Sequence, residues 1–351
     1  MKVSLIASLI ACLSLFAMPE KTARPAPSEK NSAQANSTAD HKVHVWMKNV
    51  DFHLSDDIVV NIHTLDGHLP PLGNFEFPVF DDKNSFAIAV DTANISITLA
   101  SLTNDLNEWV FGAPNAPLKN LKVSASGDKI KLNGSLVSKA GVPFESQGTL
   151  VLAPDGMIRV HTTNIKTAHL PVKGLMNIFG VETESLVNTS HAKGVTIDKD
   201  DMVLDPQKVL PPPVLQGHLT KVELRGQEIY LTFGPSAGSS AQAAAGNSSA
   251  PASDARSDCG GRNFIAVKGG TIRFGKLTMD DADMQLVDRD PQNPFDFSSD
   301  HYKEQLEAGY SKITSKFGLC AFVPDYNKIA RHPTKQVKKE TPAPAKPEAS
   351  H

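Results

Sequence analysis

The middle of the chain reads Gly148-Thr-Leu-Val-Leu-Ala-Pro-Asp-Gly-Met-Ile-Arg-Val-His161. Apolar residues recur at every second position on either side of 154–156, first at Leu150 and Leu152 and then at Ile158 and Val160. A period of two residues is typical of a strand with one buried face. Pro-Asp-Gly is a turn signal of the kind that closes hairpins. The stretch therefore predicts two antiparallel strands joined by a tight turn.

The same alternation recurs on both sides of this hairpin. Further strands are predicted at 86–90, 95–99, 130–133, 222–225 and 229–233. The strands follow one another through short turns, without the intervening helices that a parallel βαβ fold needs. We therefore expect a meandering antiparallel sheet and an α+β fold with few helices.

Three segments carry the 3.6-residue period of an amphipathic helix. The first contains Leu102, Leu106, Trp109 and Val110, with Ser101 or Thr103 as its cap and Gly112 and Pro114 at its end. The second contains Pro171, Val172, Leu175, Met176 and Phe179. The third predicts one long helix through Tyr302, Leu306, Tyr310, Ile313 and Phe317, capped by Ser298 or Ser299. Each apolar stripe is interpreted as packing on the sheet, with docking onto a membrane surface as the alternative.

Composition divides the chain into segments. Residues 19–41 and 331–351 are rich in Pro, Ala and charge, which predicts a flexible spacer and a disordered tail. Residues 235–258 form a Ser/Ala-rich linker or insertion. Two foldable stretches remain, a β-rich domain at 42–234 and a smaller strand-plus-helix module at 259–330. The module is either a separate unit or a completion of the same sheet.

The N-terminus predicts export. Residues 3–18 carry no charge, and this run is shorter than the roughly 20 residues that span a bilayer but suits a signal peptide. We therefore expect 1–18 to be a leader and the protein to reach the periplasm or cell envelope. Leu9-Ile10-Ala11-Cys12 resembles a lipobox and leaves open a lipid anchor on Cys12.

Export would place the cysteines in an oxidising compartment, where disulfides persist. If Cys12 leaves with the leader, Cys259 and Cys320 are the pair that remains, and one disulfide between them is predicted. Two independent thiols are the alternative.

Charge and motifs exclude several classes of protein. Lys+Arg 35 against Asp+Glu 38 gives a net charge of -3, which argues against a nucleic-acid partner. Gly234-Pro-Ser236-Ala-Gly238 matches the G-x-S-x-G pattern, but Ser/Ala sequence follows it where a nucleophile elbow needs a helix. The histidines form no HExxH motif, and the acidic groups lack EF-hand spacing. We therefore expect no enzyme, no metal and no cofactor.

A recurrent pattern over residues 100–234 resembles a known family. It includes Pro117-Leu-Lys-Asn-Leu-Lys-Val123, Leu210-Pro-Pro-Pro-Val-Leu-Gln-Gly217 and Val222-Glu-Leu-Arg-Gly-Gln-Glu-Ile-Tyr-Leu-Thr-Phe233. In these features the chain resembles the LmeA-like phospholipid-binding proteins, relatives of the tubular lipid-binding (TULIP) superfamily. The resemblance implies a strongly curved antiparallel sheet rolled around one or two short helices, with an apolar interior for acyl chains. The 235–258 stretch and the 259–330 module depart from that family pattern.

These observations predict an exported, non-enzymatic lipid-binding protein whose ligand is a phospholipid or fatty acid, with possible peripheral contact to a membrane. The candidate lining residues are Leu102, Leu106, Trp109, Ile130, Leu132, Leu150, Leu152, Leu175, Met176 and Phe179. The alternative is a cell-envelope scaffold or protein-interaction module without a lipid ligand. An envelope hydrolase, resting on Ser236 alone, is the third hypothesis.

Overall fold

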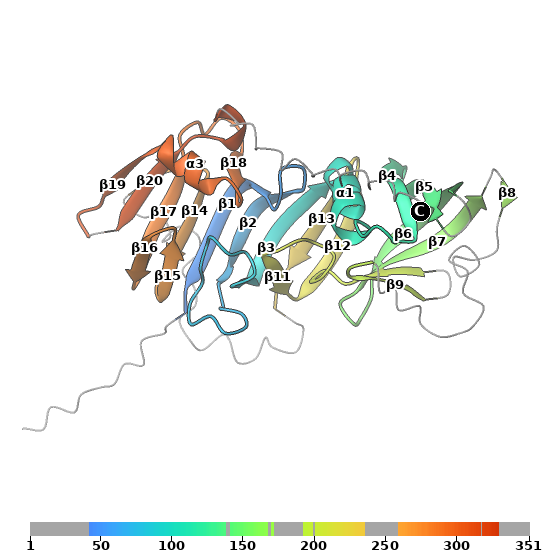
Figure 1. The fold of residues 1–351 in the computed structure, drawn as a ribbon, viewed down its shortest axis with the longest axis horizontal. Coiled ribbons are helices and arrows are strands. Elements are labelled where there is room, and N and C mark those ends of the chain that lie inside the picture. Colours follow the sequence, from blue (N-terminus) through green and yellow to red (C-terminus); the bar gives the residue numbers. More distant parts are fainter. Residues whose placement is uncertain are drawn as a thin grey trace, which may run out of the picture. The chain divides into compact units, whose positions relative to one another are not determined.

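Two large β-sheets and one small hairpin contain all the strands of the described residues (Figure 1). The computed structural model describes residues 42–137, 141–167, 170–171, 192–198, 201–235, 259–316 and 318–329. All of them belong to one compact unit, Asp40–His351. Strands dominate and helices are few, as the sequence predicted.

The larger sheet has eleven strands in the described residues. They are β1 (His44–His53), β2 (Val59–His68), β3 (Ala87–Thr98), β11 (Val214–Gly217), β12 (Leu219–Arg225), β13 (Glu228–Phe233), β14 (Phe264–Lys268), β17 (Asp283–Asp288), β18 (Phe295–Ser298), β19 (Tyr310–Ile313) and β20 (Leu319–Val323). Their order is β12-β13-β3-β2-β1-β14-β17-β20-β19, with β11 beside β3 and β18 beside β1. Most pairs are antiparallel, but β1–β18, β3–β11 and β17–β20 are parallel.

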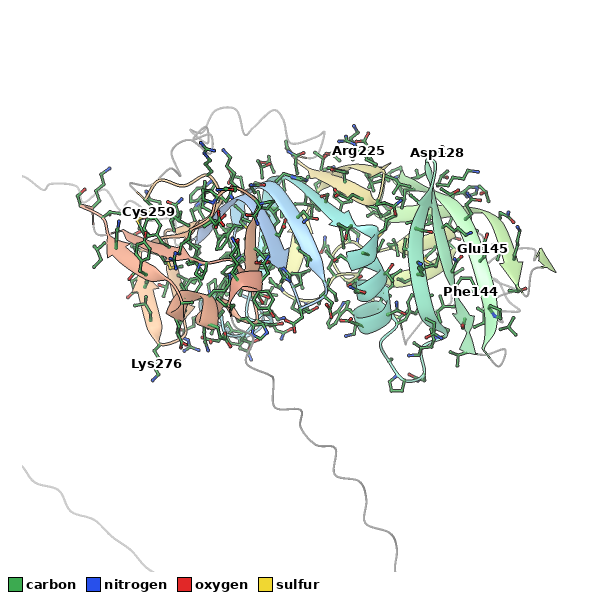
Figure 2. All side chains as sticks on the ribbon, turned by 90° about the horizontal axis from the view of Figure 1, so that it is seen from above. Asp128, Phe144, Glu145, Arg225, Cys259 and Lys276 are labelled. Carbon is green, nitrogen blue, oxygen red and sulfur yellow. A yellow bond between two sulfur atoms is a disulfide. The ribbon has the colours of Figure 1, made fainter. Side chains whose placement is uncertain are left out.

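The smaller sheet is antiparallel throughout its described pairs. It contains β4 (Leu118–Ser126), β5 (Lys129–Leu136), β6 (Val142–Leu152), β7 (Ile158–Thr167), β8 (Leu170–Pro171), β9 (Val195–Asp198) and β10 (Asp201–Leu204), and its main path is β4-β5-β6-β7-β10-β9. A separate hairpin joins β15 (Thr271–Phe274) to β16 (Leu277–Asp280). Figure 2 places Asp128, Arg225 and Lys276 at the tips of three hairpins.

The predicted hairpin at 148–161 is confirmed. Leu150 lies opposite Val160 and Leu152 opposite Ile158, and Gly156 in the turn has a φ of 81°, which favours glycine. The strands predicted at 86–90 and 95–99 are one continuous strand, β3. Asp91, Thr92 and Asn94, which separate the two predicted strands together with Ala93, are exposed.

The first predicted helix is present, but its predicted caps are wrong. α1 (Leu99–Asp105) continues into a π-helical turn at Leu106–Val110. Thr98 is the N-cap, because its Oγ1 accepts a hydrogen bond of 3.0 Å from the Ser101 N–H. Ser101 and Thr103 hydrogen-bond other backbone groups: Ser101 Oγ bonds both N and O of Val59, and Thr103 Oγ1 donates to the Leu99 carbonyl.

The prediction of one long C-terminal helix is wrong in its second half. α3 covers Tyr302–Glu307 only, and Tyr310 and Ile313 lie in strand β19. Its N-cap is His301, whose N–H donates to Ser298 Oγ. The chain leaves the helix at Gly309, where a Cβ would lie 2.5 Å from the Phe322 carbonyl oxygen. Pairing with β20 and stacking of Tyr310 on Phe322 at 4.9 Å outweigh the helical period. Phe317 lies outside the described residues.

The second predicted helix falls almost wholly outside the described residues. Val172, Leu175, Met176 and Phe179 are not described, and neither are 1–41, 236–258 and 330–351. Pro171 belongs to the two-residue strand β8, so it does not begin a helix. In the described part of the chain, no helix is long and apolar enough to cross a bilayer.

The segment after residue 259 contributes strands to the larger sheet, since β14 pairs with β1 along its whole length. Cys259 and Cys320 are joined by a disulfide with a Cα–Cα distance of 5.5 Å, as predicted. This bond ties the start of the segment to β20, and a short 3-10 turn, η4 (Tyr326–Lys328), follows that strand.

Two hydrophobic cores result from this arrangement. The first lies under the larger sheet and includes Phe52, Phe80, Phe295 and Phe297. The second includes α1 and the apolar face of the smaller sheet. The strands therefore form two sheets with two adjoining cores, where the sequence predicted one sheet.

Candidate functional site

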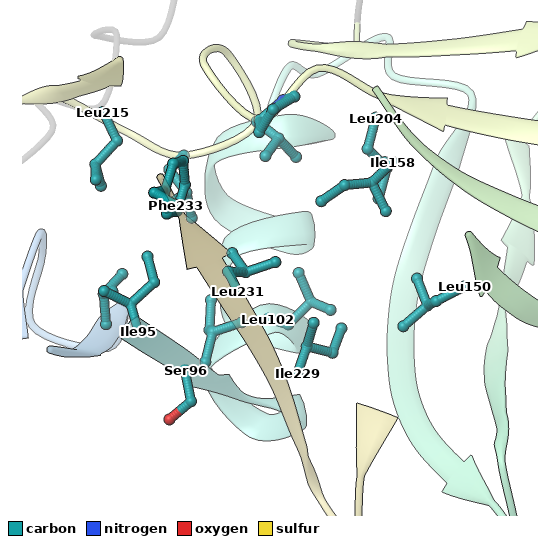
Figure 3. Close-up of a pocket in the computed structure, with 15 residues that line it drawn as sticks. Ile95, Ser96, Leu102, Leu150, Ile158, Leu204, Leu215, Ile229, Leu231 and Phe233 are labelled. Carbon is teal, nitrogen blue, oxygen red and sulfur yellow. The ribbon is translucent and has the colours of Figure 1, made fainter. Parts of the chain in front are cut away.

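An apolar cavity of about 60 Å³ lies between the two sheets (Figure 3). The larger sheet contributes Ile95 and Ile97 from β3 and Ile229, Leu231 and Phe233 from β13. Because alternate side chains of a strand point to the same face of the sheet, these residues of each strand reach the cavity together. The cavity thus lies where the edge of the larger sheet meets the smaller one.

The opposite wall comes from the smaller sheet and from α1. Leu150 of β6, Ile158 of β7 and Leu204 of β10 face the strands of the larger sheet in Figure 3, and Leu102 of α1 lies between them. β6 also contacts β12 directly. Residues from both sheets therefore have to pack together to close the cavity.

A third wall comes from the connection between β10 and β11. Residues 205–213, which we call the strap, run from Leu204 in the smaller sheet to β11 in the larger one. Pro206, Val209 and Leu210 of the strap line the cavity. Leu204 and Leu215, the lining residues at either end of this connection, lie on opposite sides of Figure 3.

The lining is chemically inert. Ser96 is the one polar residue among the fifteen that line the cavity, and its Oγ lies 3.2 Å from Nε2 of His63. Figure 3 shows that this hydroxyl points away from the other lining side chains. No lining residue therefore offers a nucleophile, an acid or a base to a molecule in the cavity, and the site is suited to apolar surface alone.

Several large apolar side chains beside the cavity are only half-buried. Six of them pack against both cores: Trp109, Leu150, Leu204, Leu210, Val222 and Leu231. Core side chains in well-packed proteins touch neighbours on all sides. These six form a seam between the cores, where part of their apolar surface still meets water.

The predicted lining residues divide into three groups. Leu102 and Leu150 line the cavity, and Trp109 and Leu152 are half-buried close to it. Leu106, Ile130 and Leu132 are buried in the second core and do not line it. Leu175, Met176 and Phe179 lie outside the described residues.

Most of the lining was missed at the sequence level. Ile95, Ile229, Leu231 and Phe233 lie on strands that the alternation had located. The signal for them was present, but alternation does not show which strand of one sheet will face another sheet. The strap carried no period at all, and nothing in its sequence points to a cavity wall.

A buried carboxylic acid lies at the end of α1. Asp105 has no exposed surface, and neither of its carboxyl oxygens has a hydrogen-bond partner. Burial, with the nearby charge of Glu108 as a smaller cause, raises the pKa of Asp105 to about 8. Asp105 is therefore mostly uncharged at pH 7. It does not line the cavity.

A polar cluster joins β1, β18 and η4 at the C-terminal end of strand β1. Nε2 of His53 lies 2.6 Å from Oδ1 of Asp296. The Tyr326 hydroxyl donates to Asp56 at 2.7 Å, and the ring of His301 stacks on that of Tyr326 at 5.1 Å. These contacts tie four separate segments together.

The acidic residues at 198 and 201 form ion pairs within the smaller sheet. Asp198 and Asp201 pair with Arg159 and His161 across the β7–β10–β9 ladder, and no group of His, Cys, Asp and Glu there could hold a metal ion. Ser236 lies outside the described part of the chain. Comparison with protein-family models, curated proteins and solved structures finds no match for the chain.

Proposed function

We propose that the protein is an exported, non-enzymatic lipid-binding protein that holds an acyl chain between its two sheets. The observation that supports this proposal is the apolar cavity together with its half-buried apolar seam. Removing apolar surface from water contributes about 25 cal/mol per Å². A ligand that covers the seam therefore gains free energy without any polar contact.

The cavity has to widen to hold such a ligand. Ligand sites usually enclose about 300–1,000 Å³, whereas this cavity has about 60 Å³. An acyl chain therefore requires an expansion of about fivefold or more, by separation of the side chains that meet at the seam. In its full extent the interior would be the apolar tube of a TULIP-like fold, formed by a curved sheet around α1.

Export is part of the proposal. The uncharged run at 3–18 favours it, and the Cys259–Cys320 bond is of the kind that persists in oxidising compartments. An exported carrier in the cell envelope would meet its phospholipid or fatty acid at a membrane surface.

The test is displacement of a fluorescent fatty acid from the purified protein, with native mass spectrometry to detect lipid that copurifies. Leu231→Asp places a carboxylate in the seam and should weaken binding at least about tenfold, because a charge is costly in an apolar site. Leu277→Asp is the matched control, since Leu277 is 49% exposed and distant in the fold. If neither measurement finds acyl binding to the folded protein, the scaffold function stands in its place.

A further inference from the structure

We infer that the strap is the entrance of the cavity and that the hydrogen bond from Trp109 to Lys208 holds this entrance closed. The inference rests on the proposed function, because it describes how an acyl chain reaches the cavity. It assigns Trp109 a positioning role that is separate from lining the cavity.

The strap is held chiefly through its first half. Asp205 N donates to the Gly194 carbonyl at 2.8 Å, and the N–H groups of Lys208 and Val209 donate to the Asp205 carbonyl. Trp109 Nε1 donates to the Lys208 carbonyl at 3.3 Å. The bonds to the Asp205 carbonyl close one turn within the strap, the Gly194 bond fixes the start of that turn, and the Trp109 bond joins it to the π-helical turn.

The second half of the strap has little capacity for such bonds. Residues 211–213 are all proline, and proline has no backbone N–H. This half cannot donate to either sheet until β11 begins at Val214. Releasing the first turn would therefore leave 211–213 held by packing alone, since Pro211 and Pro213 are buried but have no N–H to donate.

Movement of the strap would open the cavity directly. Pro206, Val209 and Leu210 would leave the wall together, and the half-buried Leu210 belongs to both cores. The two sheets themselves would keep their ladders, because the strap pairs with neither. Opening thus requires breaking a few hydrogen bonds and no strand pairing.

Trp109 is placed to resist this movement, because its hydrogen bond to Lys208 would have to break. Its ring is half-buried between the two cores, and the Lys193 ammonium lies 3.1 Å above the ring centre. Loss of one hydrogen bond changes an equilibrium constant by roughly two- to tenfold. That is enough to favour the closed strap while still allowing a ligand to displace it.

A glycine on the other side of the strap provides a second way to test its movement by substitution. Gly194 has a φ of 67°, and a Cβ built there would lie 2.6 Å from the Val209 nitrogen. Gly194→Ala therefore pushes the strap outward. Gly127→Ala is the matched control, because Gly127 has a φ of 65° with no atom within 4 Å of its Cβ position. Both substitutions carry the same backbone strain, and only the first presses on the strap.

The experiment uses the full chain with Trp46→Phe, which leaves Trp109 as the single tryptophan. A saturated sixteen-carbon fatty acid is mixed with it in stopped flow, and the emission of Trp109 is followed. We expect a change in emission on binding, and an association rate about three- to tenfold higher in Gly194→Ala than in Gly127→Ala, the factor that weakening one hydrogen bond permits. Amide exchange at Lys208 and Val209 should rise in Gly194→Ala.

Trp109→Phe gives an independent measurement if Gly194→Ala does not fold. It keeps an aromatic ring but loses the Nε1–H donor, so displacement of a fluorescent fatty acid should show the same acceleration. If all these variants bind fatty acid with equal association rates, the strap is not the entrance of the cavity. The proposed function would remain intact. Absence of bound fatty acid in every variant by native mass spectrometry would instead overturn the proposed function, and the strap with it.

Discussion

His53, the last residue of β1, and Asp296 of the neighbouring strand β18 form a close pair, with Nε2 of the imidazole 2.6 Å from Oδ1 of the carboxylate. The other ring nitrogen, Nδ1, lies 3.1 Å from the carbonyl oxygen of Asp56. A carbonyl and a carboxylate can only accept, so both bonds form together only when the ring carries two protons. The geometry therefore favours a positively charged His53.

This pair predicts a pH-dependent stability. Burial lowers the pKa of His53, but the hydrogen bond and charge of Asp296, together with the Asp56 carbonyl and the charge of Asp51, outweigh burial and raise it above 6.5. Because the folded pKa is raised, the contribution is fully present below about pH 6.5 and is lost as the pH rises through the folded value. His53→Gln should therefore cost about 1.5–3 kcal/mol at pH 5 and less at pH 9, measured by urea unfolding. An equal loss at both pH values would contradict the charged pair.

Replacement of Asp105 should stabilise the protein, whereas replacement of His53 should destabilise it. Its pKa is raised to about 8 by burial, so the stability that its neutral form allows is lost as the pH rises from about 4 through 8. Asp105→Asn cannot ionise. The variant should therefore gain stability relative to the parent between pH 5 and pH 9, by about 1–3 kcal/mol.

The exposed Asp128 is the control for this measurement. Asp128→Asn, at a surface position, should change the unfolding free energy by no more than about 0.5 kcal/mol. If Asp105→Asn leaves the pH dependence of the unfolding free energy unchanged, then Asp105 is ionised in the folded protein and has a partner.

The Cys259–Cys320 bond predicts a large loss on reduction. The two cysteines are 61 positions apart in the sequence. Closing a loop of that length constrains the unfolded chain by about 4 kcal/mol in the chain-entropy model. Cys259→Ser with Cys320→Ser should lower the unfolding free energy by roughly that amount, and addition of a reductant should no longer affect the variant.

The sequence located part of the strands, those with clear alternation, because alternation is a local property. Leu150, Leu152, Ile158 and Val160 lie on one hairpin, and each position could be assigned from its immediate neighbours. The prediction of a long C-terminal helix failed because the structure there depends on a contact distant in the sequence. Tyr310 pairs with Phe322, a partner that no local period can reveal.

The candidate site shows the same limit. Leu102 and Leu150 were predicted and do line the cavity, while Ile130 and Leu132 satisfied the same pattern and lie in the second core. A buried position and a cavity position look alike in sequence, because both are apolar. The distinction depends on where the two sheets meet, which contacts between distant segments decide.

The N-cap of α1 predicts a local loss of stability. The Thr98 side chain accepts from the Ser101 N–H at 3.0 Å, and removal of such a cap costs about 0.5–2 kcal/mol. Thr98→Ala should lower the unfolding free energy by that amount, whereas Thr98→Ser should retain most of it. Since α1 carries Leu102, the alanine variant should also weaken acyl binding. An unchanged unfolding midpoint in Thr98→Ala would show that the cap does not stabilise the helix.

A series of fatty acids with increasing chain length tests how far the cavity can widen. Each buried methylene contributes about 0.8 kcal/mol, so affinity should rise about fourfold per carbon until the space between the sheets is full and then level off. Leu102→Trp adds volume to the wall and should move the plateau to a shorter chain, while Leu277→Trp at an exposed position should not. Fatty alcohols should follow the same series as fatty acids, because the lining offers no charge to a head group. A flat dependence on chain length, or a plateau unmoved by Leu102→Trp, would place the ligand outside this cavity.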